Sequence, residues 1–379
     1  MRFALLGDHA DGRAIARALI ASGRHHLHAY YGSRTEADAR LEWPQVRFLT
    51  DLEELLADPA VEAVIVAGKP AERLDQLRRV LQSERSAFCV HPVDAKPDGA
   101  YEINMLQGDT HQVVVPLLPL AVNRKVDEIA QRLETTGPPS LVELEYRAPD
   151  EPLFEGDGSA ARPTFPGWEV LRRLGGAVAE VQAFARDEAV RHGEPATIQG
   201  RFESGGLFRA AYYPRRRTTE IRLNVMGPDG ESGSFPIGMG EEDWLRLVER
   251  FETATTRLRS TPRAAPGSGP AGDAGGPPTW LDEIRAAELD DAARRGIERR
   301  KAVTLEYQAV NEDVGFKGTM TLVGCGLLWF IPVLLVISVW LPQIGWLIVP
   351  VLFGFLLLQL LRWFVPAPSR SGDNIAPGD

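Results

Sequence analysis

The sequence has 379 residues, of which 44% are hydrophobic and 25% charged, so the chain can bury the cores of two domains. Its net charge of −10 argues against a nucleic-acid partner, because the phosphates of DNA or RNA would be repelled. The two cysteines, Cys89 and Cys325, are far apart in sequence, which argues against a structural disulfide and suits a reducing compartment.

The N-terminal stretch up to Arg34 has the pattern of a βαβ unit, the first half of a dinucleotide-binding fold. Residues 3–6 form a short apolar run that predicts a buried strand, and Gly7 ends it. Residues 12–22 carry apolar side chains at helical spacing, and residues 26–31 predict a second strand.

The turn between this strand and helix is an altered phosphate-binding sequence. It contains Gly7 and Gly12, which keep the tight turn and the close packing of helix on strand. His9 replaces the middle glycine, the one that lets a pyrophosphate approach the backbone. Asp8 and Asp11 add negative charge at the helix N-terminus, where phosphates bind. The architecture predicts a dinucleotide site with a damaged phosphate turn.

Strands and helices continue to alternate up to residue 118. Further strands are expected at 45–49, 61–67, 87–90 and 113–117, and helices at 51–57 (capped by Thr50), 73–82 and 101–107. This alternation is typical of an α/β fold with a doubly wound parallel sheet. We therefore assign residues 1–118 to a Rossmann dinucleotide-binding-like domain.

The region 119–310 has the pattern of an α+β domain with an open, largely antiparallel sheet. Strands are expected at 142–146, 197–202, 207–213 and 221–225, and helices at 168–174, 242–253 and 280–301. Gly205 and Gly206 predict a hairpin turn between the second and third of these strands. Residues 260–278 are mostly Pro, Gly, Ala and Ser, which predicts a flexible linker or loop.

The C-terminal region predicts a membrane anchor. The chain is uncharged from Gly318 to Leu361, about twice the ~20 residues that one spanning helix needs. We expect a two-helix transmembrane hairpin within 318–365, in contact with the lipid bilayer, and a disordered tail at 366–379. Basic residues flank both ends, so the positive-inside rule puts the N-terminal domains and the tail in the cytoplasm, at the inner membrane.

Several segments together resemble the Gfo/Idh/MocA oxidoreductase family. The matching segments, in chain order, are 3–12, 61–67, 87–92, 174–183, 226–231 and 287–295. The resemblance implies a Rossmann domain followed by an α+β domain, and oxidation or reduction of sugars and cyclitols with a nicotinamide cofactor. A membrane hairpin is not a usual feature of the family.

Two departures from the family fall on its catalytic residues. Members end the fifth strand in Glu-Lys-Pro, where the lysine positions substrate and nicotinamide, but here His91 precedes Pro92. His91 suits acid–base work because its unperturbed pKa is about 6.5, although it lacks the lysine's fixed charge and reach. Members also carry Asp and His on the following substrate helix, where only Glu169 could replace the acid. A structural or cofactor-contact role for His91 is the alternative.

The expected cofactor contacts lie at the ends of the parallel strands. They are Gly7, His9, Gly12, Ser33, Arg34, Ala67, Gly68 and Pro92. Ser33 and Arg34 stand where an NAD-selective fold places an acid, and would suit a 2′-phosphate, so NADP is favoured over NAD. No metal site is expected, because His25, His26 and His28 have no carboxylate or cysteine cluster around them.

Two functions remain open. The chain is either a membrane-anchored NAD(P)-dependent oxidoreductase acting on a sugar-like small molecule, or a catalytically silent descendant that serves as a binding or scaffold protein. Whether it is an enzyme depends on whether His91 and Glu169 face each other across a crevice that His9 leaves open. The sequence is compatible with a homo-oligomer and does not identify the substrate.

Overall fold

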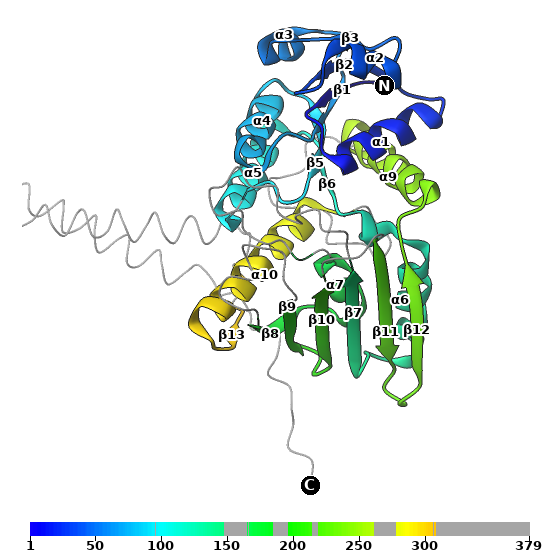
Figure 1. The fold of residues 1–379 in the computed structure, drawn as a ribbon, viewed down its shortest axis with the longest axis vertical. Helices are drawn as coiled ribbons and strands as arrows, with labels where there is room; N and C mark the ends of the chain where they lie inside the picture. Colours follow the sequence, from blue (N-terminus) through cyan, green and yellow to red (C-terminus); the bar gives the residue numbers. More distant parts are fainter. Residues whose placement is uncertain are drawn as a thin grey trace, which may run out of the picture. The chain divides into compact units, whose positions relative to one another are not determined.

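The structure is a computed structural model that describes residues 1–94, 96–147, 165, 167–184, 196–213, 219–260, 278–305 and 307. Two sheets organise these residues (Figure 1). The expected hairpin at 318–365 and tail at 366–379 lie outside the described residues, as does nearly all of the expected linker at 260–278. Among the helices that the structure describes, none combines the length and apolar character needed to cross a bilayer.

The first sheet is parallel, with strand order β3-β2-β1-β4-β5-β6. Its strands are β1 (Arg2–Leu6), β2 (His26–Tyr31), β3 (Arg47–Phe48), β4 (Ala63–Val66), β5 (Ser86–Val90) and β6 (Val114–Leu117). Its helices are α1 (Ala10–Ala21), α2 (Glu36–Glu42), α3 (Leu52–Ala57), α4 (Pro70–Gln82) and α5 (Pro97–Thr110). The expected doubly wound sheet is confirmed, and its strand order reverses between β1 and β4, the place where such folds bind ligands.

The second sheet is mixed, with strand order β12-β11-β7-β10-β9-β8-β13. Its strands are β7 (Leu141–Arg147), β8 (Val178–Phe184), β9 (Ala196–Phe202), β10 (Leu207–Tyr213), β11 (Glu220–Met226), β12 (Ser232–Ile237) and β13 (Val303–Thr304). The accompanying helices are η1 (Pro119–Val122), α6 (Arg124–Thr136), α7 (Trp168–Gly175), α9 (Glu241–Ser260) and α10 (Trp280–Arg299). Strands β7 and β10 pair in parallel and the other neighbouring strands of this sheet pair antiparallel, so the expected largely antiparallel sheet is confirmed.

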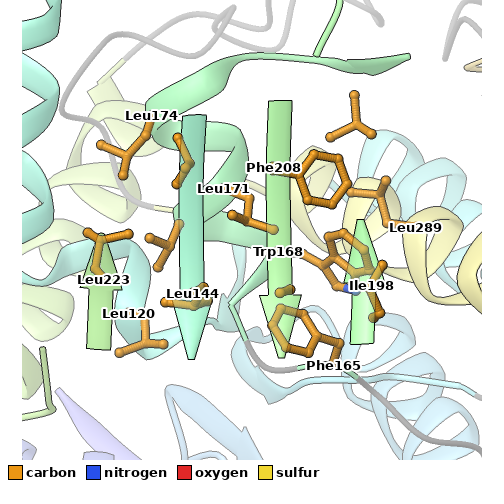
Figure 2. Close-up of a cluster of buried hydrophobic side chains, with 14 of the residues drawn as sticks. Leu120, Leu144, Phe165, Trp168, Leu171, Leu174, Ile198, Phe208, Leu223 and Leu289 are labelled. Atoms are coloured by element: carbon orange, nitrogen blue, oxygen red, sulfur yellow. The ribbon is translucent and has the colours of Figure 1, made fainter. Parts of the chain in front are cut away.

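One apolar cluster holds the second sheet to its helices (Figure 2). Trp168 at the start of α7 is fully buried and meets Phe165 and Phe208 edge-on, with ring centroids 5.3 and 6.1 Å apart. Leu144 of β7 and Leu289 of α10 are also fully buried in this cluster. Because alternate residues along each strand point to this side, the packing fixes which strand residues face α7 and α10.

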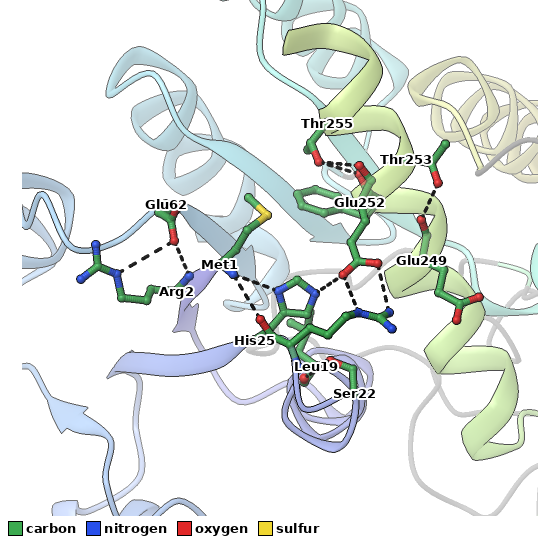
Figure 3. Close-up of polar contacts among 12 residues, drawn as sticks. Met1, Arg2, Leu19, Ser22, His25, Glu62, Glu249, Glu252, Thr253 and Thr255 are labelled. Atoms are coloured by element: carbon green, nitrogen blue, oxygen red, sulfur yellow. Dashed lines mark hydrogen bonds and ion pairs between the residues drawn. The ribbon is translucent and has the colours of Figure 1, made fainter. Parts of the chain in front are cut away.

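Helix α9 returns from the second domain to cover the first sheet. Phe251 stacks on Phe88 of β5 with ring centroids 4.3 Å apart. At the same end of the helix, Glu252 bonds the ring of His25 at 2.6 Å and the guanidinium of Arg24 at 3.0 Å (Figure 3). The apolar stack and the ion pairs fix α9 against β5 and the segment between α1 and β2.

Helix α10 belongs to both cores. Near its start, Trp280 and Ile284 pack with the first sheet and its helices, and Trp280 Nε1 donates to the carbonyl of Ala100 at 2.7 Å. Further along, Leu289 and Ala293 pack with the second sheet. One helix therefore sets the position of the second sheet relative to the end of β5.

Past α10, Tyr307 is fixed to the second sheet. Its hydroxyl donates to the carbonyl of Val178 at 2.7 Å and accepts from the amide of Val178 at 2.9 Å. The guanidinium of Arg285 lies 4.5 Å from the centre of the Tyr307 ring. The end of the described chain is therefore tied to β8 and to α10.

Some local expectations needed correction. Asp51, rather than Thr50, caps α3, because its carboxylate accepts from the amide of Glu53 at 3.0 Å. Helix α2 has no expected counterpart because its sequence is mostly charged and buries only Ala39. Helix α5 begins at Pro97, four residues before the expected start at Tyr101, because proline suits the first turn of a helix.

Candidate functional site

The glycine turn after β1 packs directly against the end of β4. Gly7 has a φ of +96°, and a Cβ added to it would lie 2.2 Å from the carbonyl oxygen of Ala67. A Cβ on Gly12 would lie 2.2 Å from the Cβ of Ala67. Only glycine fits at these two positions, as in a dinucleotide-binding turn.

His9 covers the N-terminus of α1. Its amide donates to the carbonyl of Ala67 at 3.2 Å, and its Nδ1 accepts from the amide of Asp11 at 3.2 Å. This bond places the ring proton on Nε2. Burial, aided by the charge of Arg73, lowers the pKa of His9 to about 4, so the ring is neutral. Its side chain is 27% exposed and offers one neutral N–H donor beside the turn.

Two acidic residues flank this turn in different ways. Burial raises the pKa of Asp11 to about 6, against the opposing charges of Arg73 and His91. Burial would also raise the pKa of Asp8, but hydrogen bonds from Tyr30 and Ser33 outweigh it and the pKa is lowered. Asp8 therefore stays ionised near neutral pH, while Asp11 gains a proton in mildly acidic solution.

Ser33 and Arg34 have partners within the protein. The carboxylate of Asp8 accepts from both the amide and the hydroxyl of Ser33 at 2.8 Å. Arg34 donates to Glu42 at 2.6 Å and to the carbonyl of Asp38 at 3.2 Å. Both side chains that were expected to bind a 2′-phosphate are thus already hydrogen-bonded to carboxylates, Ser33 to Asp8 and Arg34 to Glu42.

Arg73 ties the ends of β4 and β5 together. It is 1% exposed and donates to the carbonyl of Gly68, at 3.2 and 2.9 Å, and to that of Pro92 at 2.5 Å. Gly68 and Pro92, both expected cofactor contacts, thus lie on either side of a buried positive charge. No sequence pattern indicates this role of Arg73, because its partners are backbone carbonyls at the ends of two strands.

His91 lies between two carboxylates of α10. Its Nδ1 is 2.7 Å from Glu283 Oε2, and its Nε2 is 3.7 Å from Asp290 Oδ2, too far for a hydrogen bond. Burial alone would lower the pKa of His91, but the charge of Glu283, supported by Asp290, raises it to about 10. The imidazole is therefore a cation at neutral pH.

The two carboxylates are themselves held in place. Glu283, 1% exposed on its side chain, also accepts from the amide of Val93 at 2.9 Å. Asp290 Oδ1 accepts from Trp168 Nε1 at 2.6 Å and from the amide of Phe165 at 2.9 Å. Burial raises the pKa of Asp290, against the opposing effect of His91.

Glu169 lies near His91 without bonding to it. It sits in the first turn of α7 and is 8% exposed. Burial raises its pKa, while its own amide, the charge of His91 and the amide of Gly167 lower it. Among the described contacts, no hydrogen bond or ion pair joins Glu169 to His91, whose partners come from α10.

Glu283 and Asp290 were missed, although a signal for them exists in the sequence. They are seven residues apart, which puts them on one face of a helix, and that face also carries the buried Ala286, Ala287 and Ala293. Two acids on the buried face of an amphipathic helix require a buried partner. For a metal ion, the described residues contain no group of three or more His, Cys, Asp or Glu that could hold one.

Sequence comparison matches only the first domain. The sequence model of the Gfo/Idh/MocA family, described as an oxidoreductase family with an NAD-binding Rossmann fold, matches residues 1–116. No curated protein sequence matches the chain.

Solved structures match almost over their whole lengths. A probable dehydrogenase from Thermotoga maritima has a TM-score of 0.65 at 18% identity, over 80% of this chain and 98% of its own. A myo-inositol dehydrogenase from Corynebacterium glutamicum has 0.66 at 16%, over 81% and 99%. A scyllo-inositol dehydrogenase from Lactobacillus casei, with bound NAD(H) and scyllo-inositol, has 0.64 at 12%, over 80% and 98%.

The parallel sheet with its glycine turn at the switch point, followed by the mixed second sheet, gives the chain the fold of these solved dehydrogenases. Within this fold, residues 1–116 are similar in sequence to the NAD-binding Rossmann domain of the Gfo/Idh/MocA oxidoreductase family.

Proposed function

We propose that the protein is an NAD(H)-dependent oxidoreductase acting on a small, sugar-like substrate. The observation that carries the proposal is the charged His91 at the carboxyl end of β5, paired with Glu283 and Asp290. A cation at this place can orient a substrate oxygen beside a nicotinamide ring, the task of the family's lysine. The inositol dehydrogenases of the same fold support the choice of a polyol or its ketone.

The residues of the glycine turn fit a dinucleotide. Gly7 and Gly12 keep the backbone close to β4, as the fold requires. The Nε2–H of His9 would donate to a phosphate oxygen in place of the backbone approach that the middle glycine allows. Gly68 and Pro92, held by Arg73, would border the nicotinamide end, where the bound cofactor supplies or accepts a hydride.

We propose NAD(H) over NADP(H) as the cofactor, although Ser33 and Arg34 suggested NADP. An ionised Asp8 lies beside Ser33, where the fold places the adenosine ribose, and an acid there accepts from the 2′-hydroxyl. A 2′-phosphate would meet the charge of Asp8 and would have to displace Glu42 from Arg34. The NAD(H) bound in the Lactobacillus casei enzyme agrees with this choice.

The charges around His91 favour an uncharged substrate. Glu283, Asp290 and Glu169 surround a single imidazolium, so a carboxylate or phosphate on the substrate would be repelled from this cluster. A polyol, a sugar or the corresponding ketone fits better, because its oxygens can accept and its hydroxyls can donate without adding charge.

The second candidate is a catalytically silent protein that binds a partner through the same fold. The occupied turn favours it: His9 covers the helix N-terminus, and Asp8 and Asp11 add negative charge there. Glu169 and His91 are also not joined, as a direct acid–base pair would require. Under this proposal the ion cluster of His91 is purely structural.

Cofactor binding separates the two candidates. The full chain, purified in a mild detergent, is titrated calorimetrically with NADH and NADPH. Micromolar binding of NADH, weakened by His9→Ala and unchanged by the exposed control His26→Ala, supports the oxidoreductase. If neither dinucleotide binds at millimolar concentration, the silent protein is the better description, and a search for protein partners is the next step.

Membrane anchoring through residues 318–365, with the domains on the cytoplasmic side, is a further part of the proposal. It rests on the uncharged stretch of the sequence. The test is fractionation of cells that express the full chain: membrane association that resists alkaline carbonate supports an anchor, and release by carbonate contradicts it. The mass of the detergent-solubilised protein would show whether it is a homo-oligomer.

A further inference from the structure

Between His91 and Asp290, the site contains a buried hydrogen-bond donor that is not satisfied. His91 Nε2 is buried and has no hydrogen-bond partner among the described residues, while Asp290 Oδ2 lies 3.7 Å away. A buried donor without a partner costs about 1–3 kcal/mol. One oxygen atom placed beside this gap could bond both groups, accepting from Nε2–H and, if it carries a proton, donating to Asp290.

The other nitrogen of the ring is fully engaged. Nδ1–H donates to Glu283, whose second oxygen accepts from the amide of Val93. This arrangement fixes the plane of the ring and leaves Nε2–H as the free donor. Because Trp168 and Phe165 hold Asp290 from the opposite side, the width of the gap is set by two well-packed elements, β5 and α10.

We propose that α10 makes His91 the proton donor for reduction of a substrate carbonyl, whose oxygen accepts from His91 Nε2 and, once it is protonated, donates to Asp290 Oδ2. This inference rests on the proposed function. Glu283 and Asp290 act as positioning residues, since Glu283 holds the imidazolium and Asp290 sets where the oxygen binds. The Nε2–H bond breaks, its proton goes to the carbonyl oxygen, and a neutral imidazole remains that takes a proton back from water.

When bound, NADH would supply the hydride for the carbonyl carbon. The products would then be an alcohol and NAD⁺, and the charges would balance with the proton from His91. The direction follows from the charge of His91. An imidazolium can give a proton at neutral pH but cannot remove one from an alcohol, so the site favours reduction over oxidation there. Oxidation requires alkaline solution, in which His91 is neutral.

The charged groups around His91 come from four elements. Glu283 and Asp290 belong to α10, Glu169 to α7, Asp11 to α1 and Arg73 to α4. The carboxylates favour the imidazolium and Arg73 opposes it. Glu283 has the shortest contact, so its removal should change the protonation of His91 most.

The test measures the protonation of His91 directly. The full chain in detergent is labelled with ¹⁵N-histidine, and the spectrum of the seven histidines is followed from pH 5 to pH 10.5, with His91→Gln to assign the signal. We expect His91 to remain an imidazolium above pH 9. Glu283→Gln should lower its pKa by at least about one unit, whereas Glu288→Gln, a neighbour on α10 that pairs with Arg285, should leave it unchanged.

Kinetics complete the test. With NADH and a panel of ketoses and inososes, reduction should lose rate at the pH at which His91 loses its proton. His91→Gln should lower kcat at least ~100-fold while the Kd for NADH changes less than threefold. If Glu283→Gln fails to fold, Asp290→Asn, which keeps the acceptor for Trp168, is used instead. It removes the other carboxylate beside the ring and should lower the pKa of His91.

The outcomes distinguish this inference from the proposed function. If NADH does not bind, the oxidoreductase itself is wrong. If NADH binds but His91 titrates near pH 6.5, or keeps its pKa in Glu283→Gln, the inference alone is overturned. A His91→Gln variant that reduces ketones at the wild-type rate also overturns it.

Discussion

The carboxylate of Asp8 accepts two hydrogen bonds from Ser33, one from its amide and one from its hydroxyl, both at 2.8 Å. The glycine turn after β1 thereby supplies an acid at the end of β2, where the sequence of β2 itself supplies none. The acid at the end of β2 therefore comes from the turn after β1, and its position in the sequence does not reveal this.

This arrangement predicts the cofactor preference. Asp8→Asn removes the negative charge beside the expected 2′-position, so the affinity for NADPH should rise roughly tenfold relative to NADH. The ratio of the two dissociation constants, measured by calorimetry, checks the prediction. Asp109→Asn, an exposed substitution in α5, is the control and should leave the ratio unchanged. An unchanged ratio in Asp8→Asn would show that Asp8 does not face the ribose.

Asp11 predicts a pH dependence of cofactor binding. Its pKa is raised to about 6, so the folded protein binds a proton there that the free carboxyl, with a pKa of 3.8, releases. Folding stability contributed by this group therefore falls as the pH rises from 3.8 to about 6 and is level above. A pyrophosphate favours the neutral form further, so NADH affinity should weaken as the pH rises through 6.

Asp11→Asn removes the titrating group and is the decisive variant. Its NADH affinity should be nearly constant between pH 5 and pH 7.5, and should equal or exceed that of the unchanged protein at pH 7.5. Calorimetric titration at several pH values checks this. The same pH slope in both proteins would contradict the assignment to Asp11.

His91 predicts loss of stability in alkaline solution. Its pKa is raised in the folded protein to about 10, from an ordinary value of 6.5, so its ion pair is fully present below pH 6.5. The stabilisation decreases as the pH rises above 6.5 and is lost once the pH passes about 10. The Tm, measured by scanning fluorimetry, should fall across this interval.

In Glu283→Gln the fall in Tm should be much shallower, because the folded and unfolded pKa values of His91 then lie closer together. Glu288→Gln should keep the slope of the unchanged protein. The comparison uses slopes, so a general loss of stability in either variant does not affect it. Equal slopes in all three proteins would exclude His91 as the source.

Substitution of Arg73 should lower the free energy of unfolding substantially. Arg73→Met removes the donors to the carbonyls of Gly68 and Pro92 and leaves both with buried oxygens, which should cost about 2–4 kcal/mol of unfolding free energy. Urea unfolding followed by tryptophan fluorescence measures it. Arg78→Met, on the same helix but 31% exposed in its pairs with Glu102 and Asp75, should cost less than about 1 kcal/mol.

The packing of α9 predicts a second loss of unfolding free energy. Phe251→Ala removes a fully buried ring from its stack on Phe88, which should cost about 3–5 kcal/mol. Glu252→Gln, the next residue, weakens the contact with His25 but leaves the stack, and should cost less. If the two variants unfold at the same urea concentration, the apolar stack is not what fixes α9.

The sequence predicts the elements of the first sheet well, because its parallel strands are continuous apolar runs. Strand β4 is buried at every position, and β2 has the expected bounds of 26–31. Helix α2 cannot be found in this way, since tertiary contacts and a cap by Thr35 hold it rather than an apolar stripe. Helix α6 also has no expected counterpart, although its buried residues Val126, Ile129, Ala130 and Leu133 have helical spacing and a closer reading of the pattern would have indicated it.

The site is harder to predict because its charges meet across the chain. Glu283, which determines the charge of His91, lies 192 positions later in the sequence. Arg73 lies within the helix expected at 73–82 but faces the strand ends, which spacing alone does not show. The sequence therefore predicts where ligands bind in this fold, while the protonation of each group depends on which distant side chains pack against it.

The two hydrogen bonds between the Tyr307 hydroxyl and the backbone of Val178 have a consequence for the site. The hydroxyl of Tyr307 bonds β8, while its ring packs against the guanidinium of Arg285. Arg285 lies on α10 between Glu283 and Asp290, the two residues that contact His91. Tyr307 therefore joins β8 to the turns of α10 that carry these two carboxylates, so this side of the second sheet helps to hold the geometry around His91.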